Sequence, residues 1–249
     1  MEQNTGIIIQ ARTGSSRLPN KIFLPFYKNK NLLELLIEKL KTCGSTPIVV
    51  ATTTSPADDA IVKLADRMQV SAYRGSENNV LERFIDAATH FSFNTIIRVC
   101  SDNPFIDIDG LLQLIQINDV ADYTCFSANG VPTIKTHFGF WAEKVKLKAL
   151  IKVSETTNEK LFLEHVTNFL YTHPEMFTIK KTEVPQYISN KKIRLTLDTI
   201  DDFNMQKDLY NALILKFGNR FTLADIVGYL DDNTIYYDLM KQNIEKNEK

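Results

Sequence analysis

The sequence predicts an α/β fold, in which a mostly parallel sheet is flanked by helices on both faces. The first observation is that short apolar runs alternate with amphipathic segments of helical period as far as residue 115. The second is the composition, 44% apolar and 24% charged over 249 residues, which is ordinary for a globular protein. We expect one domain over 1–249, because no repeat, linker or break interrupts the chain.

Each of the first four expected strands is a short apolar run, and an amphipathic helix follows it. The strands are expected at 7–9, 48–51, 70–73 and 95–100, and the helices at 32–40, from 56 onward, at 80–88 and at 111–115. Asn31 and Ser55 are candidate helix caps, the latter with Pro56 at the first helical position. Asp58 and Asp59 then stand in the first turn and are expected to serve the helix dipole.

The alternation loosens after about residue 121. We expect strands at 122–126 and 133–141 around a turn at 129–132, helices at 143–152 and 158–171, an extended segment at 177–184, a strand at 193–197, and closing helices at 201–216 and 222–230. Asp201 and Asp202 stand in the first turn of the first closing helix, where they suit its dipole. The polar tail from Gln242 is expected to be frayed.

Charge and cysteine content narrow the class of protein. The formal net charge of -1 gives no support for binding to nucleic acid or to a membrane surface. The three cysteines, Cys43, Cys100 and Cys125, are widely spaced, fit no metal pattern and suggest a reducing compartment. No window is long and apolar enough to span a membrane, and the first residues lack the features of a signal peptide. We therefore expect a cytoplasmic protein.

A basic loop follows the first apolar run and carries the strongest functional signal. The run QARTGSSRLPNK at 10–21 contains Arg12, Arg17 and Lys21, and the stretch 3–33 contains no acidic residue. Cationic side chains and backbone N–H groups at the end of a strand suit a polyphosphate, so a nucleotide is the first ligand to consider. The loop lacks the spacing of the common P-loop. The alternative is a solvated basic loop without a ligand.

Two carboxylates end other apolar runs. Asp102 follows the strand expected at 95–100, and Asp198 follows the run at 193–197. Ligands of open α/β sheets bind beyond the carboxyl ends of the strands, so the two side chains are expected to converge with the basic loop. A Mg²⁺ ion between them would relieve their repulsion, because it binds one or two carboxylates together with substrate phosphates. The alternatives are a turn residue for Asp102 and a helix cap for Asp198.

Four further residues are candidates on weaker grounds. Arg74 follows a strand and either faces the nucleotide or forms a structural ion pair. His137 lies in a Thr-His-Phe-Gly segment and is a candidate for an acceptor pocket. Glu164 and His165 lie on an expected amphipathic helix, and because His165 borders its apolar face, the alternative for this residue is a core histidine. No spacing in the sequence indicates a covalent nucleophile.

The opening motif closely resembles that of the spore coat polysaccharide biosynthesis protein F-type (SpsF-type) cytidylyltransferases, which are related to the synthetases of CMP-Kdo and CMP-sialic acid. The resemblance rests on IIIQARTGSSRLPNK and continues, in order, through IVVATTTSPADDAI, YRGSENNVLERF, IIRVCSDNPFID, EHVTNFLYTHPEMF and RLTLD. It implies a Rossmann-like, glycosyltransferase-A-type nucleotidyltransferase fold, with a mostly parallel mixed sheet flanked by helices. It also implies transfer of CMP from CTP to an acceptor with release of pyrophosphate.

The resemblance assigns roles to particular positions. Arg12, Lys21, Asp102 and Asp198 are implied to be catalytic, with both aspartates binding Mg²⁺. Nucleotide binding is expected from Gln10, Ala11, Arg12, Gly14, Ser15, Arg17, Lys21 and Arg74. The acceptor is expected near His137, Glu164 and His165, within an acceptor-side region at about 121–192 that precedes the C-terminal helices at about 201–249.

Three positions depart from the family pattern. Asn20 stands where glycine is usual, which puts the backbone angles of the loop in question. Asn103 and Phe105 stand in a DNPF sequence where this group usually reads DCPL. These two departures bear on the acceptor rather than on the nucleotide.

The expected acceptor is a sugar acid or a phosphorylated sugar or polyol, for surface polysaccharide or glycoconjugate synthesis. Related synthetases also suggest a homodimer. Two other functions compete with this one. The first is a sugar transferase of the same fold class, which would use a nucleotide sugar and release a nucleoside diphosphate. The second is a relative that binds a nucleotide without turnover.

Overall fold

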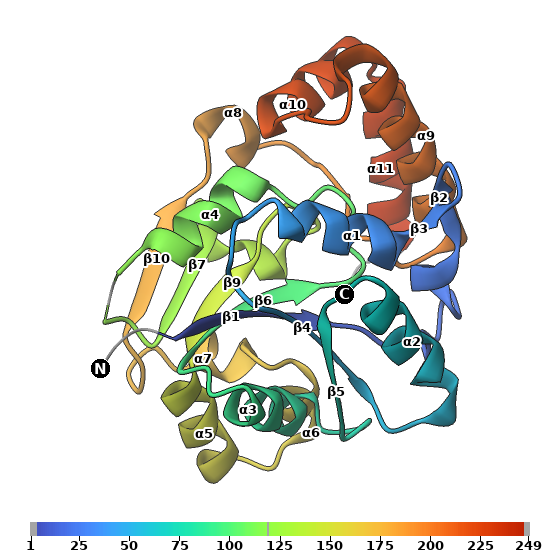
Figure 1. Cartoon of the computed structure of the whole chain (residues 1–249). Coiled ribbons are helices and arrows are strands. Elements are labelled where there is room, and N and C mark those ends of the chain that lie inside the picture. Colours follow the sequence, from blue (N-terminus) through green and yellow to red (C-terminus); the bar gives the residue numbers. More distant parts are fainter. Residues whose placement is uncertain (1–3, 119, 247–249) are drawn as a thin grey trace.

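Alternating strands and helices make up most of the chain (Figure 1). The structure, a computed structural model, describes residues 4–118 and 120–246. The strands are β1 (Thr5–Gln10), β2 (Pro25–Tyr27), β3 (Lys30–Asn31), β4 (Ile48–Thr53), β5 (Ser71–Gly75), β6 (Thr95–Cys100), β7 (Tyr123–Ala128), β8 (Val131–Pro132), β9 (Glu143–Lys146) and β10 (Ile179–Glu183). The helices are α1 (Leu32–Lys41), α2 (Asp59–Arg67), α3 (Val80–His90), α4 (Ile108–Gln116), α5 (Leu147–Thr156), α6 (Lys160–Glu164), α7 (Asn168–Thr172), α8 (Gln186–Ser189), α9 (Ile200–Phe217), α10 (Leu223–Asp232) and α11 (Ile235–Lys246), with short 3-10 turns η1 (Lys21–Phe23), η2 (Pro56–Asp58) and η3 (Thr133–Lys135).

The main sheet is mixed and mostly parallel, as the sequence predicts. Its strand order is β10-β7-β9-β6-β1-β4-β5, with β8 paired to β7. β1 lies parallel to β4 and to β6, whereas β9 runs antiparallel to both β6 and β7. The ends of β1, β4, β5 and β6 therefore meet at one edge of the sheet, where a ligand of such a fold binds.

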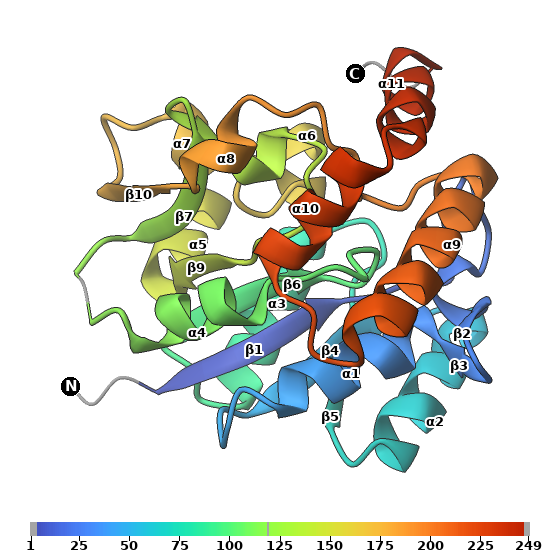
Figure 2. The ribbon, with the colours of Figure 1, turned by 90° about the horizontal axis from the view of Figure 1, so that it is seen from above.

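Both faces of the sheet are buried under helices (Figures 1 and 2). In β1, Ile7 and Ile9 pack into the core under α1, α4, α9 and α10, while Ile8 packs into the core under α3 and α5. All three isoleucines are 0% exposed. This is why the central strands read as continuous apolar runs rather than as alternating ones.

The region 133–146 differs from the expectation. The predicted strand at 133–141 is wrong, because η3 and an irregular segment occupy it, and the strand β9 lies where a helix was expected to begin. The strand was not predicted because Glu143 and Lys144 are charged, and charged residues are not expected in a buried strand. Both are nevertheless only 2% exposed. Glu143 forms an ion pair with Arg98, and Lys144 donates to the backbone carbonyl of Ile117.

Two further expectations near the site are wrong. The helix predicted at 158–171 is broken into α6 and α7 at His165, which has φ -102° and ψ 78°. The segment 193–197 is extended but forms no strand. Its backbone instead pairs with two segments that are distant in the sequence: Leu195 N–H donates to the carbonyl of His137, and Leu197 N–H donates to that of Asp102.

The chain end is more ordered than the sequence predicts. Helix α11 covers 235–246, so the expected fraying from Gln242 is wrong as far as Lys246, and 247–249 lie outside the described residues. Met240 and Asn243 are buried, and the Asn243 amide donates to Asp202 at 3.2 Å. No helix within 4–118 and 120–246 is long and apolar enough to cross a membrane.

Candidate functional site

Asp58 fixes the basic loop after β1 to the end of β4. It is 1% exposed, and one of its oxygens accepts hydrogen bonds from the backbone N–H and the hydroxyl of Thr13, at 2.8 and 2.6 Å. Its other oxygen accepts from the hydroxyls of Thr52 and Thr53, at 3.0 and 2.5 Å. Burial opposes ionisation, but these hydrogen bonds prevail and lower the pKa of Asp58. Asp58 therefore anchors the loop, rather than mainly serving a helix dipole as expected.

Asn20 turns the loop back toward the sheet. Its φ of 56° and ψ of 21° lie in the left-handed region, which asparagine tolerates better than most residues. Its N–H donates to the carbonyl of Thr13 at 3.0 Å, and η1 starts at the next residue, Lys21. The asparagine thus adopts a conformation that a glycine would also adopt, and the departure from the family pattern leaves the loop geometry possible.

Lys21 joins the two carboxylates that the sequence predicts to converge. Its Nζ lies 2.8 Å from Oδ2 of Asp102 and 3.5 Å from Oδ1 of Asp198, and it donates to the carbonyl of Leu197 at 2.6 Å. Burial acts against both charges, yet the attraction between them raises the pKa of Lys21 and lowers that of Asp102. Lys21, Asp102 and Asp198 come from segments that are far apart in the sequence. Together they form a charged cluster whose side chains are buried or half-buried.

Asp198 is surrounded by cations. Besides Lys21, Arg17 lies 2.9 Å from its Oδ1 and Arg194 lies 3.4 Å from its Oδ2. The side chain of Asp198 is 15% exposed, whereas that of Arg17 is 41% exposed. Arg17 is therefore the most exposed charged side chain around the two aspartates, and its guanidinium is accessible to an anionic ligand.

Arg194 is a buried organiser of this cluster that the sequence reasoning did not find. It pairs with Asp202 through two contacts of 2.8 Å, and one of its N–H groups donates to Nδ1 of His137 at 2.9 Å. A guanidinium has only donors, so Nδ1 of His137 must accept. Asp202 thus does more than serve the dipole of α9. A charged residue inside the apolar run 193–197 is the signal that could have identified Arg194.

Arg12 and Glu164 link the basic loop to the break between α6 and α7. Nη2 of Arg12 lies 3.5 Å from Oε1 of Glu164, and the side chains are 39% and 55% exposed. His165 caps the end of α6 and is exposed, so the alternative of a core histidine is wrong. His137, by contrast, reaches the aspartate cluster through Arg194. Of the expected acceptor residues, His137 is thus linked to the cluster, whereas Glu164 is linked to Arg12 of the basic loop.

Gln10 belongs to a buried polar network under the loop that the sequence did not predict. Arg98 donates to the Gln10 side chain at 2.9 Å and forms an ion pair with Glu143. Glu143 also accepts hydrogen bonds from the hydroxyls of Tyr123 and Thr167. The network ties β1, β6 and β9 to the residues just before α7.

The remaining predicted nucleotide residues lie on the loop or beside it. Ala11 is buried and extends the pairing of β1 with β4, Gly14 is exposed, and the Ser15 hydroxyl accepts from a loop N–H. Arg74 instead clamps the start of α2: it donates to the carbonyl of Ser55 at 2.8 Å and to Asp59 at 2.6 Å. Ser55 itself makes no capping hydrogen bond through its side chain.

The residues present suit a divalent cation that also binds a phosphate-bearing ligand. Asp102 and Asp198 both lie within 3.5 Å of one cation, the Lys21 ammonium, so they converge on a shared positive charge. No group of three or more His, Cys, Asp or Glu that could hold a metal occurs within the described ranges 4–118 and 120–246. Mg²⁺ is commonly bound by one or two carboxylates together with phosphate oxygens of a substrate, and Asp102 and Asp198 could supply the two carboxylates.

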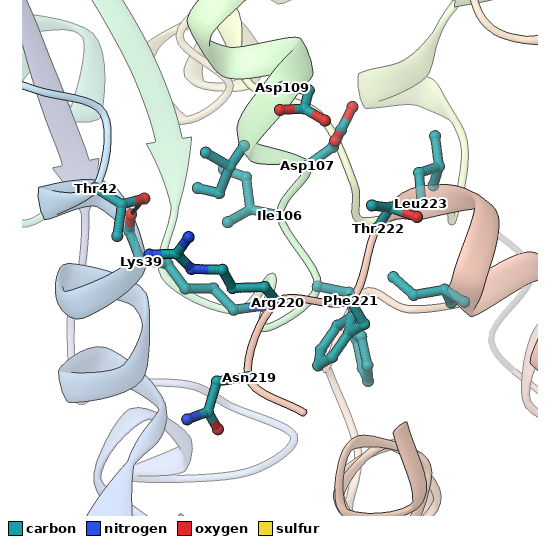
Figure 3. Close-up of a pocket in the computed structure, with 13 residues that line it drawn as sticks. Lys39, Thr42, Ile106, Asp107, Asp109, Asn219, Arg220, Phe221, Thr222 and Leu223 are labelled. Atoms are coloured by element: carbon teal, nitrogen blue, oxygen red, sulfur yellow. Dashed lines mark hydrogen bonds between the residues drawn. The ribbon is translucent and has the colours of Figure 1, made fainter. Parts of the chain in front are cut away.

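A separate cavity of about 400 Å³ lies on the α1 and α10 side of the molecule (Figure 3). Lys39 and Arg220 line one side of it, and Asp107 and Asp109 line another (Figure 3). Burial lowers the pKa of Lys39 to about 8. None of the residues that line this cavity belongs to the charged cluster, so the chemistry predicted from the sequence lies outside it.

Comparison with known proteins identifies the family. The sequence model described as Cytidylyltransferase matches residues 6–227. The spore coat polysaccharide biosynthesis protein SpsF of Bacillus subtilis is 32% identical over 236 residues, covering 91% of this chain and 93% of SpsF.

Solved structures agree with this assignment. A cytidylyltransferase of Leptospira borgpetersenii is similar with a TM-score of 0.84 and 28% identity, covering 95% of this chain and 97% of that one. A CMP:2-keto-3-deoxy-manno-octonic acid synthetase complexed with CTP shares the fold, with a TM-score of 0.63 and 16% identity over 84% of this chain and 99% of its own. The predicted family and fold class are confirmed, and the chain belongs to the cytidylyltransferase family.

Proposed function

We propose that this protein transfers CMP from CTP to a sugar acid or to a phosphorylated sugar or polyol, with release of pyrophosphate. The observation that carries the proposal is the meeting of Lys21 with Asp102 and Asp198 beside the basic loop. Membership of the family and likeness to SpsF support this reaction and a place in surface polysaccharide or glycoconjugate synthesis.

The cationic residues of the loop would bind the triphosphate. Arg12, Arg17 and Lys21 supply guanidinium and ammonium donors, and Asp58 holds the loop backbone in place. An acceptor oxygen would attack the α-phosphorus, the bond from that phosphorus to the bridging oxygen would break, and pyrophosphate would leave. Arg12 and Lys21 would stabilise the charge that gathers on pyrophosphate, which is positioning and electrostatic work.

Asp102 and Asp198 would hold the Mg²⁺ ion, which when bound supplies charge neutralisation at the phosphates. Arg194 would position Asp198. The Arg194 side chain is buried, is held by its ion pair with Asp202, and contacts Asp198. Without the nucleotide, Lys21 keeps the two carboxylates together. The arrangement needs no covalent enzyme intermediate.

The acceptor would lie between His137 on one side and Glu164 with His165 on the other. His137 is one side chain away from Asp198 through Arg194, and Glu164 contacts Arg12. An acceptor placed there would reach the phosphate end of the nucleotide. Its carboxylate or phosphate would find cationic partners in Arg12 and Arg17.

The decisive experiment is an acceptor panel assayed with CTP and Mg²⁺. A 2-keto sugar acid, a sugar phosphate and a polyol phosphate are each supplied, and pyrophosphate release is measured. The proposal predicts magnesium-dependent pyrophosphate release with one acceptor class. Release of a nucleoside diphosphate from a nucleotide sugar would instead indicate a sugar transferase, and CTP binding without product for any acceptor would indicate a non-catalytic relative.

A further inference from the structure

Two cations, Lys39 on α1 and Arg220 just before α10, line the cavity on that side of the molecule (Figure 3). Its volume of about 400 Å³ lies within the range of sites that bind small molecules. Among residues 4–118 and 120–246, neither Lys39 nor Arg220 forms an ion pair with a carboxylate. This wall of the cavity therefore attracts an anion.

The Lys39 side chain is held in a fixed position at the cavity wall. Its Nζ donates to the carbonyl of Pro104 at 2.9 Å and lies 4.9 Å from the centre of the Phe221 ring and 5.2 Å from that of Tyr210. The carbonyl uses one of the three donors of the ammonium. Burial lowers the pKa of Lys39 to about 8. An anion in the cavity would stabilise the ammonium form, so the position fits a bound anion better than an empty cavity.

Carboxylates line another side of the cavity (Figure 3). Asp107 accepts from the N–H of Gly110 at 3.1 Å and also hydrogen-bonds with Trp141. Asp109 is exposed, and within the described ranges it forms no ion pair. Because Asp107 is already held by neutral N–H donors, this wall offers acceptors to further neutral donors such as hydroxyls. A ligand that fills the cavity thus needs an anionic end and a hydroxylated end.

Packed aromatic rings fix the two walls relative to each other. Phe105 is 1% exposed, and its ring centre lies 5.8 Å from that of Tyr210 and 6.4 Å from that of Phe221. Tyr210 and Phe221 are in turn 5.5 Å apart. The lining segment 105–109 begins three residues after Asp102 in the chain. The cavity is therefore a preformed site whose wall continues from the end of β6.

We propose that this cavity binds a small polyhydroxylated anion, such as a sugar phosphate, at a site separate from the charged cluster. Lys39 and Arg220 would hold the anionic group, and the hydroxyls of the ligand would donate to Asp107 and Asp109. The site goes beyond the proposed function and does not rest on it, because none of the residues that line the cavity belongs to the cluster.

The binding of glucose 6-phosphate, inorganic phosphate and glucose tests the site. Affinities are measured by calorimetry and by the fluorescence of Trp141, the single tryptophan of the chain, which hydrogen-bonds with Asp107. Glucose 6-phosphate should bind the wild type more tightly than the other two probes, because it alone satisfies both walls. Arg220→Gln should weaken this binding by at least about 10-fold, as expected for loss of a charge-assisted contact.

The carboxylate wall is tested by Asp109→Ala. This variant should reduce the preference for glucose 6-phosphate over inorganic phosphate by about 5-fold, because it removes an acceptor that only the sugar uses. Its affinity for inorganic phosphate should stay the same or increase, since a negative charge is removed. An unchanged preference would contradict the assignment of the hydroxyls to this wall. Asp109 and Arg220 are both exposed, so neither substitution removes a core side chain.

Lys41→Gln is the matched control for Arg220→Gln, because Lys41 is an exposed cation of α1 that does not line the cavity. It should leave all affinities unchanged. Equal weakening by Lys41→Gln and Arg220→Gln would show unspecific attraction, and a wild type that does not bind glucose 6-phosphate would overturn the site.

The last comparison separates the cavity from the charged cluster. Binding that depends on Arg220 should survive in Arg17→Gln, whereas binding lost in Arg17→Gln and kept in Arg220→Gln would place the sugar phosphate at the cluster and overturn the proposal. A protein that releases no pyrophosphate from CTP would contradict the proposed function and leave these binding results unaffected.

Discussion

The Lys21 ammonium nitrogen lies 2.8 Å from Oδ2 of Asp102, although 81 residues separate them in the chain. The same nitrogen lies 3.5 Å from Asp198. One cation therefore connects the loop after β1, the end of β6 and the start of α9. This contact is the observation that supports the proposed placement of the phosphate end of a nucleotide there.

Replacement of Lys21 should reveal the repulsion that this lysine relieves. Two carboxylates at 4 Å repel by roughly 4 kcal/mol at an effective dielectric constant of 20. Lys21→Met should therefore lower the melting temperature, and Mg²⁺ should restore it more strongly than it stabilises the wild type. Pyrophosphate release should fall by about 10²–10³-fold.

The matched control for Lys21 is Lys30→Met, because Lys30 lies in the same basic stretch and pairs with Glu38 at an exposed position. Its melting curve should respond to Mg²⁺ as the wild type does. An equal magnesium response in Lys21→Met and Lys30→Met would contradict a shared cation site at Asp102 and Asp198.

Asp58→Asn should destabilise the protein in a pH-dependent manner. The pKa of Asp58 is lower in the folded state than in the unfolded state, where it is about 3.9. The ionised Asp58 therefore contributes fully to the free energy of unfolding above the unfolded-state pKa, and this contribution is lost as pH falls through the folded-state pKa. At pH 7 the free energy of unfolding should drop by about 1.5–3 kcal/mol relative to the wild type. Urea denaturation of both proteins from pH 3 to pH 7 measures the difference.

The difference between wild type and Asp58→Asn should shrink below about pH 4. Asp59→Asn is the matched control, since Asp59 is the neighbouring carboxylate and is 52% exposed. Asp59→Asn should lower the free energy of unfolding at pH 7 by less than Asp58→Asn does. A gap for Asp58→Asn that stays constant, or widens, toward pH 3 would argue against an ionised Asp58 as the anchor of the loop.

The left-handed backbone at Asn20 predicts which substitutions the loop accepts. Asn20→Gly should preserve both stability and affinity for CTP, because glycine adopts a φ of 56° without strain. Asn20→Val should cost roughly 1–2 kcal/mol and weaken CTP binding. Thermal unfolding and calorimetry test this pair, and equal behaviour of the two variants would show that the backbone angle has no role in the site.

The central strands of the sheet were predicted correctly from the sequence, because a strand that is buried on both faces contains a continuous apolar run. Strands β1, β4 and β6 are buried on both faces, so each contains a continuous apolar run, such as Ile7 to Ile9 in β1. Strand β9 was misassigned because Glu143 is charged, and its partners Arg98 and Thr167 lie 45 and 24 residues away. The order of α11 likewise depends on a distant contact, that between Asn243 and Asp202.

The site was predictable to the extent that it follows from strand ends. Parallel strands deliver Asp102 and the basic loop to one edge of the sheet, and the structure brings them together with Asp198. The residues that hold the site were not predictable in the same way. Asp58 and Arg194 act through partners that only the folded chain brings near.

The most direct test of the central claim is the rate of pyrophosphate release from CTP, with the active acceptor, for Asp198→Asn against Asp201→Asn. Asp201 is a nearby carboxylate on the exposed side of α9, paired with Lys246 at 3.4 Å. The account predicts that Asp198→Asn loses at least about 10²–10³-fold in rate while remaining folded, and that Asp201→Asn keeps the wild-type rate. A wild-type rate in Asp198→Asn would contradict the placement of the metal and phosphates at Asp102 and Asp198.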